Sequence, residues 1–333
     1  IWMLASMIIY TPASAAKFIP VIDLTGSFSE DFADKKAVAW EIHKACRETG
    51  FFYIKNHGIP EGMIQAQLEC ARQFFSLPQE DKIKLNVAHS PSMRGYEPMA
   101  IQALDDGSRP DFKEGFMAGI DGLQAYTTNG EFNSLNQWPK SYPEMRVQVE
   151  AYIQAMTGLG KHLLGMLALS LELPENYFAE GVERPMITNR LLHYPPQPRV
   201  GDGNQIGAGA HTDWGMITML LQDDVGGLEV RNADGEWIRA PHIPNTFIIN
   251  LGDMVPVLTR GIYRSNMHRV LNLNPERHRY SVPTFFDPSY HYRIKPLAHF
   301  EGAQEFSQEE RTVGEHIAKM YAKTYGDPAA KTA

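Results

Sequence analysis

Ala210-His211-Thr212-Asp213-Trp214-Gly215, near the middle of the chain, carries a histidine and an aspartate two residues apart. Along an extended strand, alternate side chains point to the same face, so His211 and Asp213 are predicted to share a face while Thr212 points away. One imidazole and one carboxylate are two of the three ligands of a facial triad, which holds Fe(II) and leaves its other side open. The segment therefore predicts a metal site on a strand.

Two later segments complete this predicted site. The third metal ligand is predicted to be His268, within Ser265-Asn266-Met267-His268-Arg269-Val270. Further along, Arg279-Tyr280-Ser281 places a guanidinium and a hydroxyl on one face of a strand. Such a pair suits a carboxylate, which accepts parallel charge-assisted hydrogen bonds from a guanidinium fork. We call Arg279 and Ser281 the carboxylate clamp. A metal with open positions beside such a clamp predicts an enzyme site.

These three motifs, in this order, resemble the HxD, H and RxS motifs of the isopenicillin N synthase-like branch of the Fe(II)/2-oxoglutarate-dependent dioxygenases. Upstream, Gly50-Phe51-Phe52-Tyr53-Ile54-Lys55-Asn56-His57-Gly58-Ile59-Pro60 resembles the N-terminal signature of that branch. The resemblance runs from about Phe18 to Pro288 and so covers most of the chain. Four motifs in the order of the family make the resemblance specific.

The resemblance implies three cofactors or co-substrates, namely Fe(II), 2-oxoglutarate and O2. It implies that Arg279 and Ser281 bind the distal carboxylate of 2-oxoglutarate. Tyr194 matches a family position whose hydroxyl assists there, and the alternative for Tyr194 is a core tyrosine with a satisfied hydroxyl. Leu192 stands where many plant members carry Asn, so contacts with the co-substrate differ at that position.

The implied reaction is the oxidation of a small organic substrate, with hydroxylation as the default, coupled to release of succinate and CO2. RxS is also used by the penicillin-ring-forming branch, on its peptide substrate, and by branches that make ethylene. An oxidative cyclase and an ethylene-forming enzyme are therefore alternatives. The non-enzyme alternative is a metal-binding or ligand-binding jelly roll, although such a protein has no need of open iron positions.

Composition and charge limit the possible partners. With 333 residues, 43% of them hydrophobic and 21% charged, the chain has an ordinary globular composition and can build a large core. A net charge of −8 without a basic stripe argues against a nucleic-acid partner. Cys46 and Cys70 lie in helix-like patterns and predict buried thiols without a disulfide.

The first 16 residues are apolar and end in Ala13-Ser14-Ala15-Ala16. A signal peptide carries Lys or Arg before its apolar run, and this segment carries neither. The segment is also too short to span a bilayer. We interpret residues 1–16 as a non-functional extension. We therefore expect no membrane partner, and an enzyme that uses a central metabolite is expected in the cytoplasm.

Residues 17–333 are predicted to form a single domain. Its N-terminal part, residues 17–185, is predicted to be mainly helical, with helices over residues 34–49, about 64–75 and 143–173. From about residue 186 to 300, short strands alternate with turns, and Asn232-Ala233-Asp234-Gly235 predicts a hairpin. A capping box of Thr312 and Glu315 opens a C-terminal helix over residues 312–325.

This pattern predicts a mainly β fold with flanking helices, an antiparallel jelly roll of the kind found in cupins. The resemblance sharpens the prediction to a distorted double-stranded β-helix. His57 is predicted to hydrogen-bond the backbone of a turn rather than bind a metal. Residues 88–142 show little periodicity, and we interpret them as loops that border the substrate pocket.

Five residues are predicted to contact the primary substrate from the side left open by the iron ligands and the clamp: Met93, Arg94, Tyr96, Phe116 and Phe286. Arg94 is the one cation among them, so an anionic substrate is favoured. The alternative for Arg94 is a surface ion pair with Glu97 or Glu114.

Overall fold

The computed structural model describes residues 10–12, 14–99, 111–122, 134–196, 207–271, 274, 276–298 and 311–325. Its main feature is a major sheet of eight strands in the order β1-β2-β10-β7-β12-β5-β4-β3. In that order, the strands are Val21–Asp23, Phe51–Lys55, Phe247–Leu251, Ile217–Gln222, Arg279–Asp287, Met186–Tyr194, Glu114–Ala118 and Gly95–Glu97. All neighbouring pairs are antiparallel except β1 and β2, which are parallel.

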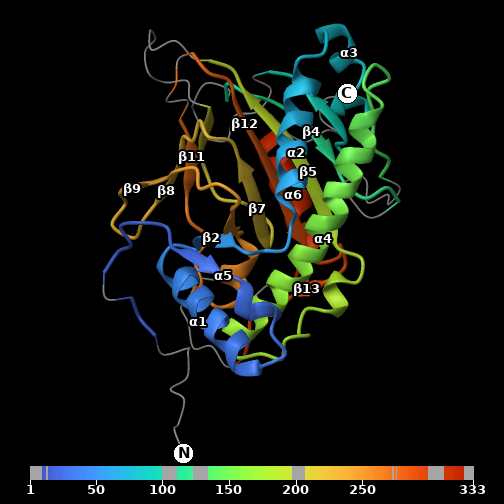
Figure 1. Cartoon of the computed structure of the whole chain (residues 1–333). Helices are drawn as coiled ribbons and strands as arrows, with labels where there is room; N and C mark the ends of the chain where they lie inside the picture. Colours follow the sequence, from blue (N-terminus) through green and yellow to red (C-terminus); the bar gives the residue numbers. More distant parts are fainter. Residues whose placement is uncertain are drawn as a thin grey trace, which may run out of the picture.

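A minor sheet of four strands, in the order β6-β11-β8-β9, faces the major sheet (Figure 1). Its strands are Ala208–His211, His268–Val270, Leu228–Arg231 and Trp237–Ala240. The predicted hairpin is confirmed, because β8 and β9 pair in antiparallel register on either side of residues 232–235. A further small sheet joins β13 (Arg293–Ile294) to β14 (Arg311–Thr312).

Helices cover the other side of the major sheet, as Figure 1 shows for α2 and α4. The helices are α1 (Phe32–Glu48), α2 (Glu61–Phe75), α3 (Gln79–Ile83), α4 (Glu144–Ser170), α5 (Met254–Leu258) and α6 (Val313–Tyr325), with short 3-10 turns at Thr25–Phe28, Val87–His89 and Glu180–Val182. None of the helices in the described ranges is both long and apolar enough to cross a bilayer.

The two faces of the major sheet belong to two hydrophobic cores. On the helix side, the methionine-rich stripe of α4 is buried, and Gly160 lets α4 approach the sheet. A Cβ on Gly160 would lie only 2.6 Å from the ring of Phe286. On the other side, a smaller core that includes Leu192, Val230 and Ile248 lies between the two sheets. Burial on both faces explains why β10 and β7 are mostly apolar.

The predicted helix boundaries agree with the structure because local signals define them. Asp31 caps the start of α1 by accepting a hydrogen bond from the backbone of Ala33 at 2.8 Å. Gly50 follows the end of α1 with φ of +66°, and a Cβ there would collide with the carbonyl oxygen of Arg264. Only glycine fits this position.

Two further local predictions are also confirmed. The backbone N–H of Thr312 donates to Glu315 at 2.8 Å and that of Glu315 donates to Thr312 at 3.1 Å, which is the predicted capping box. The imidazole of His57 accepts a hydrogen bond from the backbone of Ile59 at 3.1 Å and lies in a turn. Both features follow from residues adjacent in sequence.

The N-terminal part differs from the prediction in one respect, within residues 88–142. Residues 17–185 supply four strands, β1 to β4, to the same sheet as the later strands, and the sequence pattern itself indicates the first two, over residues 18–24 and 51–56. Loops were predicted throughout residues 88–142, and this was wrong for β3 and β4. Both strands are buried along their whole length, so they lack the alternation of apolar and polar residues that reveals a strand. Residues 100–110 and 123–133 of the predicted loop region lie outside the described residues.

Of the predicted N-terminal extension, residues 1–9 and 13 lie outside the described residues. Tyr10 packs against α1. Its hydroxyl donates to Glu48 at 2.6 Å, and its ring meets that of Trp40 edge to face. At least this part of the segment contacts the fold.

Candidate metal centre and carboxylate clamp

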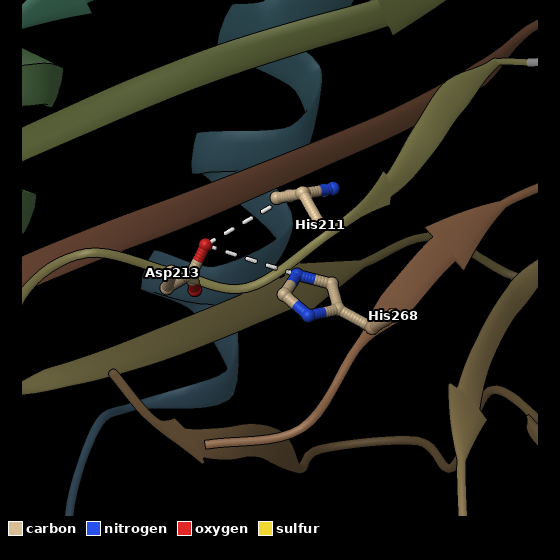
Figure 2. A group of neighbouring side chains, drawn as sticks. All are labelled: His211, Asp213 and His268. Atoms are coloured by element: carbon tan, nitrogen blue, oxygen red, sulfur yellow. Dashed lines mark ion pairs between the residues drawn. The ribbon is translucent and has the colours of Figure 1, made fainter. Parts of the chain in front are cut away.

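His211, Asp213 and His268 converge at one end of the minor sheet (Figure 2). His211 ends β6, and His268 begins β11 directly opposite it in the antiparallel register. Oδ1 of Asp213 lies 3.9 Å from Nε2 of His211 and 3.7 Å from Nε2 of His268. One ligand atom from each residue lies within 4.8 Å of the others, so the three side chains can hold one metal ion.

Asp213 is placed differently from the sequence-based expectation. The strand ends at His211, and Asp213 lies in the loop that follows, so strand alternation is not what orients it. Instead, its Oδ2 accepts hydrogen bonds from Thr218 of β7 at 2.5 Å and from Asn250 of β10 at 2.7 Å. The major sheet therefore holds one oxygen and leaves Oδ1 directed at the imidazoles.

The two imidazoles are also oriented by hydrogen bonds. Nδ1 of His211 donates to the carbonyl oxygen of Gly209 at 2.7 Å, and Nδ1 of His268 donates to that of Asn266 at 3.3 Å. Since a carbonyl oxygen can only accept, each Nε2 keeps a lone pair facing Asp213.

The electrostatics of the cluster suit a cation. Burial, together with the neighbouring His268, lowers the pKa of His211 to about 3, so its imidazole is neutral at physiological pH. Burial would raise the pKa of Asp213, but the two imidazoles and the hydrogen bonds from Asn250 and Thr218 hold it below its usual range. Two neutral nitrogens and one carboxylate oxygen fit Fe(II).

Arg279 of the clamp is buried, with an exposed fraction of 1%. It donates to the carbonyl oxygen of Gly226 at 2.5 Å, to the hydroxyl of Ser281 at 3.1 Å and to the side chain of Gln222 at 3.4 Å. Its guanidinium stacks on the ring of Tyr194, 4.7 Å from the centroid. No carboxylate pairs with Arg279 among the described residues.

A pocket between the two sheets joins the clamp to the candidate metal centre. It encloses about 570 Å³ of empty space, including its opening to solvent. Alternate residues of two major-sheet strands line it, namely Arg190, Leu192 and Tyr194 of β5 and Arg279, Ser281, Pro283 and Phe285 of β12. His211, Asp213 and His268 line it from the opposite side. One pocket therefore contains every predicted metal and clamp residue, Tyr194 included.

Two cations in this pocket were missed by sequence reasoning. Lys113 precedes β4 and forms an ion pair with Asp111, and Nε of Arg190 donates to Glu97 at 2.7 Å. Burial lowers the pKa of Lys113 to about 8, although Asp111 acts to raise it. Lys113 lies in a segment already suspected of bordering the pocket, but a single sequence does not reveal which of its charges are buried.

The five predicted substrate residues do not line this pocket. Tyr96 and Phe116 pair with each other across β3 and β4, and both belong to the core on the helix side. Phe286 also packs on that side, against Gly160, while its neighbour Phe285 lines the pocket. A shift of one residue along a strand reverses the face, which explains why Phe285 lines the pocket and Phe286 does not.

The other two predicted substrate residues lie at the start of β3. Met93 adopts a φ of 55° just before the strand. Arg94 is buried, and its guanidinium donates to the hydroxyl of Thr188 at 3.3 Å and to the carbonyl oxygen of Ile187 at 3.4 Å. The charge that suggested an anionic substrate is therefore bound to β5 rather than directed into the pocket.

Comparison with known proteins identifies the family. Residues 183–288 match the 2OG-Fe(II) oxygenase superfamily, and residues 19–141 match the N-terminal domain of non-haem dioxygenases in morphine synthesis. The 2-oxoglutarate-dependent dioxygenase citB of Monascus ruber is 39% identical over 92% of this chain and 96% of its own length.

Solved structures agree. A full-length Neurospora crassa protein, solved in complex with alpha-KG and thymine, superimposes with a TM-score of 0.81 and 26% identity, covering 93% of this chain and 98% of its own. JOX2, in complex with 2OG, Fe and JA, gives a TM-score of 0.75 and 28% identity, covering 95% of this chain and 88% of its own. The chain belongs to the 2OG-Fe(II) oxygenase superfamily.

Membership confirms several predictions. The fold is a double-stranded β-helix, and the protein is an oxidoreductase that uses Fe(II), 2-oxoglutarate and O2. It oxidises a small organic substrate and converts 2-oxoglutarate to succinate and CO2.

Proposed function

We propose that Nε2 of His211, Oδ1 of Asp213 and Nε2 of His268 bind the Fe(II) ion, and that the carboxylate clamp binds the distal carboxylate of 2-oxoglutarate. We propose further that the enzyme hydroxylates a small organic acid. The observation that carries the proposal is Arg279, a fully buried cation whose partners among the described residues are all neutral.

A buried charge without a counter-ion is costly, and an incoming carboxylate removes that cost. The guanidinium has five N–H donors, of which neutral partners engage three. The hydroxyl of Ser281 accepts from Arg279, is in hydrogen-bond contact with Tyr194 and lines the pocket. Tyr194 holds the plane of the guanidinium by stacking. A carboxylate therefore meets several oriented donors at this end of the pocket.

Residues of this chain then perform three tasks. Thr218 and Asn250 fix the Asp213 carboxylate, and backbone carbonyls fix the two imidazoles. Apolar side chains from both sheets, among them Leu192, Leu228 and Val270, exclude water between the clamp and the candidate metal centre. When bound, Fe(II) with 2-oxoglutarate and O2 supplies the oxidising chemistry.

Two observations support a small acid as the substrate. The Neurospora crassa protein is solved with thymine and JOX2 with JA, each beside the co-substrate, so a pocket of this kind accommodates small molecules. In this chain, two cations that belong to neither the triad nor the clamp, Lys113 and Arg190, line the pocket. The proposal includes a cytoplasmic location, where 2-oxoglutarate is a central metabolite.

Substrate-independent conversion of 2-oxoglutarate tests the assignment. The purified protein should release succinate only when Fe(II) and 2-oxoglutarate are both supplied. Equilibrium titration should show that 2-oxoglutarate binds and that Arg279→Met weakens its binding at least tenfold. Unchanged binding of 2-oxoglutarate to the folded Arg279→Met variant would overturn the role of the clamp.

A further inference from the structure

The ammonium group of Lys113 is a buried donor that keeps N–H groups without a partner among the described residues. Its exposed fraction is 5%, yet it lines the pocket that holds the candidate metal centre. An ammonium carries three N–H donors. Among the described residues, Asp111 is its one hydrogen-bond partner. Buried donors are normally satisfied, so a ligand that enters the pocket is the expected partner for the remaining hydrogens.

Asp111 holds this ammonium in place. One carboxylate oxygen pairs with Lys113, and the other accepts a hydrogen bond from the backbone N–H of Gly209 at 2.9 Å. Gly209 belongs to β6, and its carbonyl oxygen orients the imidazole of His211. Both oxygens of Asp111 are therefore engaged, and the carboxylate is tied to the strand that ends at the candidate metal centre.

Lys113 and the clamp come from different segments of the major sheet. Lys113 precedes β4, whereas Arg279 and Ser281 lie on β12, and β5 separates these two strands in the sheet. Arg190 of β5 lines the same flank of the pocket, and its charge acts on that of Lys113. One strand therefore separates Lys113 from the clamp, and both line the pocket that His211 also lines.

We propose that Lys113 is a specificity-determining residue that donates hydrogen bonds to a carboxylate of the primary substrate, and that Asp111 is the residue that positions it. This inference rests on the proposed function, since it needs 2-oxoglutarate to occupy the clamp. A carboxylate accepts charge-assisted hydrogen bonds, which are stronger than those accepted by a neutral amide of the same shape. The pocket should therefore prefer an acid to its own amide.

A panel of small aliphatic and aromatic carboxylic acids, each with its primary amide, tests this preference. The measured quantity is the ratio of succinate release with and without the compound, at saturating Fe(II) and 2-oxoglutarate. Acids should raise this ratio and their amides should raise it at least tenfold less. Equal stimulation by both members of the pairs, or no stimulation by any acid, overturns the inference.

Variants of Lys113 then test whether this residue causes the preference for acids over amides. Lys113→Met should abolish stimulation by the best acid and weaken its equilibrium binding at least tenfold, whereas Lys113→Arg should retain the preference for acids. Lys84→Met is the matched control, because Lys84 forms a similar ion pair with Asp81 but is exposed at the surface. Lys113→Gln replaces the Met variant if the latter does not fold, as judged by circular dichroism.

The outcomes separate this inference from the proposed function. If Lys113→Met weakens binding of 2-oxoglutarate instead of the acid, Lys113 belongs to the co-substrate site and the inference is wrong. If the wild-type protein neither binds 2-oxoglutarate nor releases succinate, the proposed function itself fails. Stimulation by acids that is unchanged in folded Lys113→Met overturns the inference alone.

Discussion

Asn250 donates a hydrogen bond to Oδ2 of Asp213 at 2.7 Å, on the oxygen that faces away from the two imidazoles. Thr218 donates to the same oxygen at 2.5 Å. The two donors come from adjacent strands of the major sheet, β10 and β7, while His211 and His268 come from the minor sheet. The candidate triad is therefore assembled across the interface between the sheets, and correct packing of the sheets is needed to form it.

Removal of these donors should weaken iron binding. Thr218→Val and Asn250→Ala each free the Asp213 carboxylate to rotate, and loss of such supporting hydrogen bonds typically costs about 10–100-fold in metal affinity. Titration of Fe(II) against a competing chelator measures the change. Thr246→Val is the control, because Thr246 hydrogen-bonds the carbonyl of Ile243 away from the pocket. Unchanged affinity in both variants would contradict this role.

Substitution of a candidate ligand should have a larger effect. Each of His211→Ala, Asp213→Ala and His268→Ala leaves two ligands, which hold iron poorly, and should abolish Fe(II)-dependent succinate release. Iron content and succinate are measured together on the purified variants. A variant with wild-type iron content and near-wild-type turnover would remove its residue from the triad.

The clamp predicts a change in one Michaelis constant. Arg279→Lys keeps the charge but loses the planar fork, and should raise the KM for 2-oxoglutarate at least tenfold. Arg277→Lys is the matched control, since Arg277 lies two residues earlier and pairs with Asp224 at the surface. If the KM for the organic substrate rises instead, Arg279 binds that substrate, which would favour the oxidative cyclase alternative.

Gly115 should be needed for the ion pair between Arg190 and Glu97. A Cβ at Gly115 would lie 2.6 Å from Oε2 of Glu97 and 3.4 Å from Nε of Arg190. Gly115→Ala should therefore displace the pair and lower the free energy of unfolding by about 1–3 kcal/mol. Gly62→Ala, where nothing lies within 4 Å, is the control. Denaturant unfolding measures both, and an equal effect in the two variants would refute the prediction.

The proposed substrate contact predicts a pH dependence. The ammonium of Lys113 loses its proton as the pH rises through about 8, the value to which burial lowers its pKa. The KM for a carboxylate substrate should therefore rise above this pH and stay low below it. In Lys113→Arg the KM should stay flat across the same range, because a guanidinium remains charged. Identical profiles for the two proteins would assign the titration to another group.

Features set by neighbouring residues could be predicted from the sequence. The end of α1 at Gly50, the capping box of α6 and the hairpin between β8 and β9 each depend on a few adjacent side chains. The triad and clamp motifs could also be predicted, because each is a short segment with a fixed spacing of residues. By contrast, β3 and β4 could not be predicted, since complete burial removes the alternation that marks a strand.

The substrate side of the pocket depends on register, which a single sequence does not reveal. The predicted Phe286 and the pocket-lining Phe285 are neighbours in β12, and their faces are decided by pairing with β5 and β7. Lys113 and Arg94 lie in the same region and carry the same charge, but only Lys113 lines the pocket. Contacts between segments far apart in the sequence decide which of the two cations reaches the pocket.

Strand β12 sets the distance between the clamp and the residues beside the candidate metal centre. Ser281 of the clamp and Phe285, which lies opposite Thr218 in the register, are four residues apart on one face, or about 13 Å along an extended strand. Because Thr218 holds Asp213, this rigid interval separates the two ends of the co-substrate site in the proposed arrangement. A keto diacid one methylene shorter than 2-oxoglutarate, such as oxaloacetate, would fail to reach both the clamp and the candidate metal centre. A longer homologue would have to bind in a bent conformation. In the proposed arrangement, the spacing along β12 therefore favours keto diacids of one chain length.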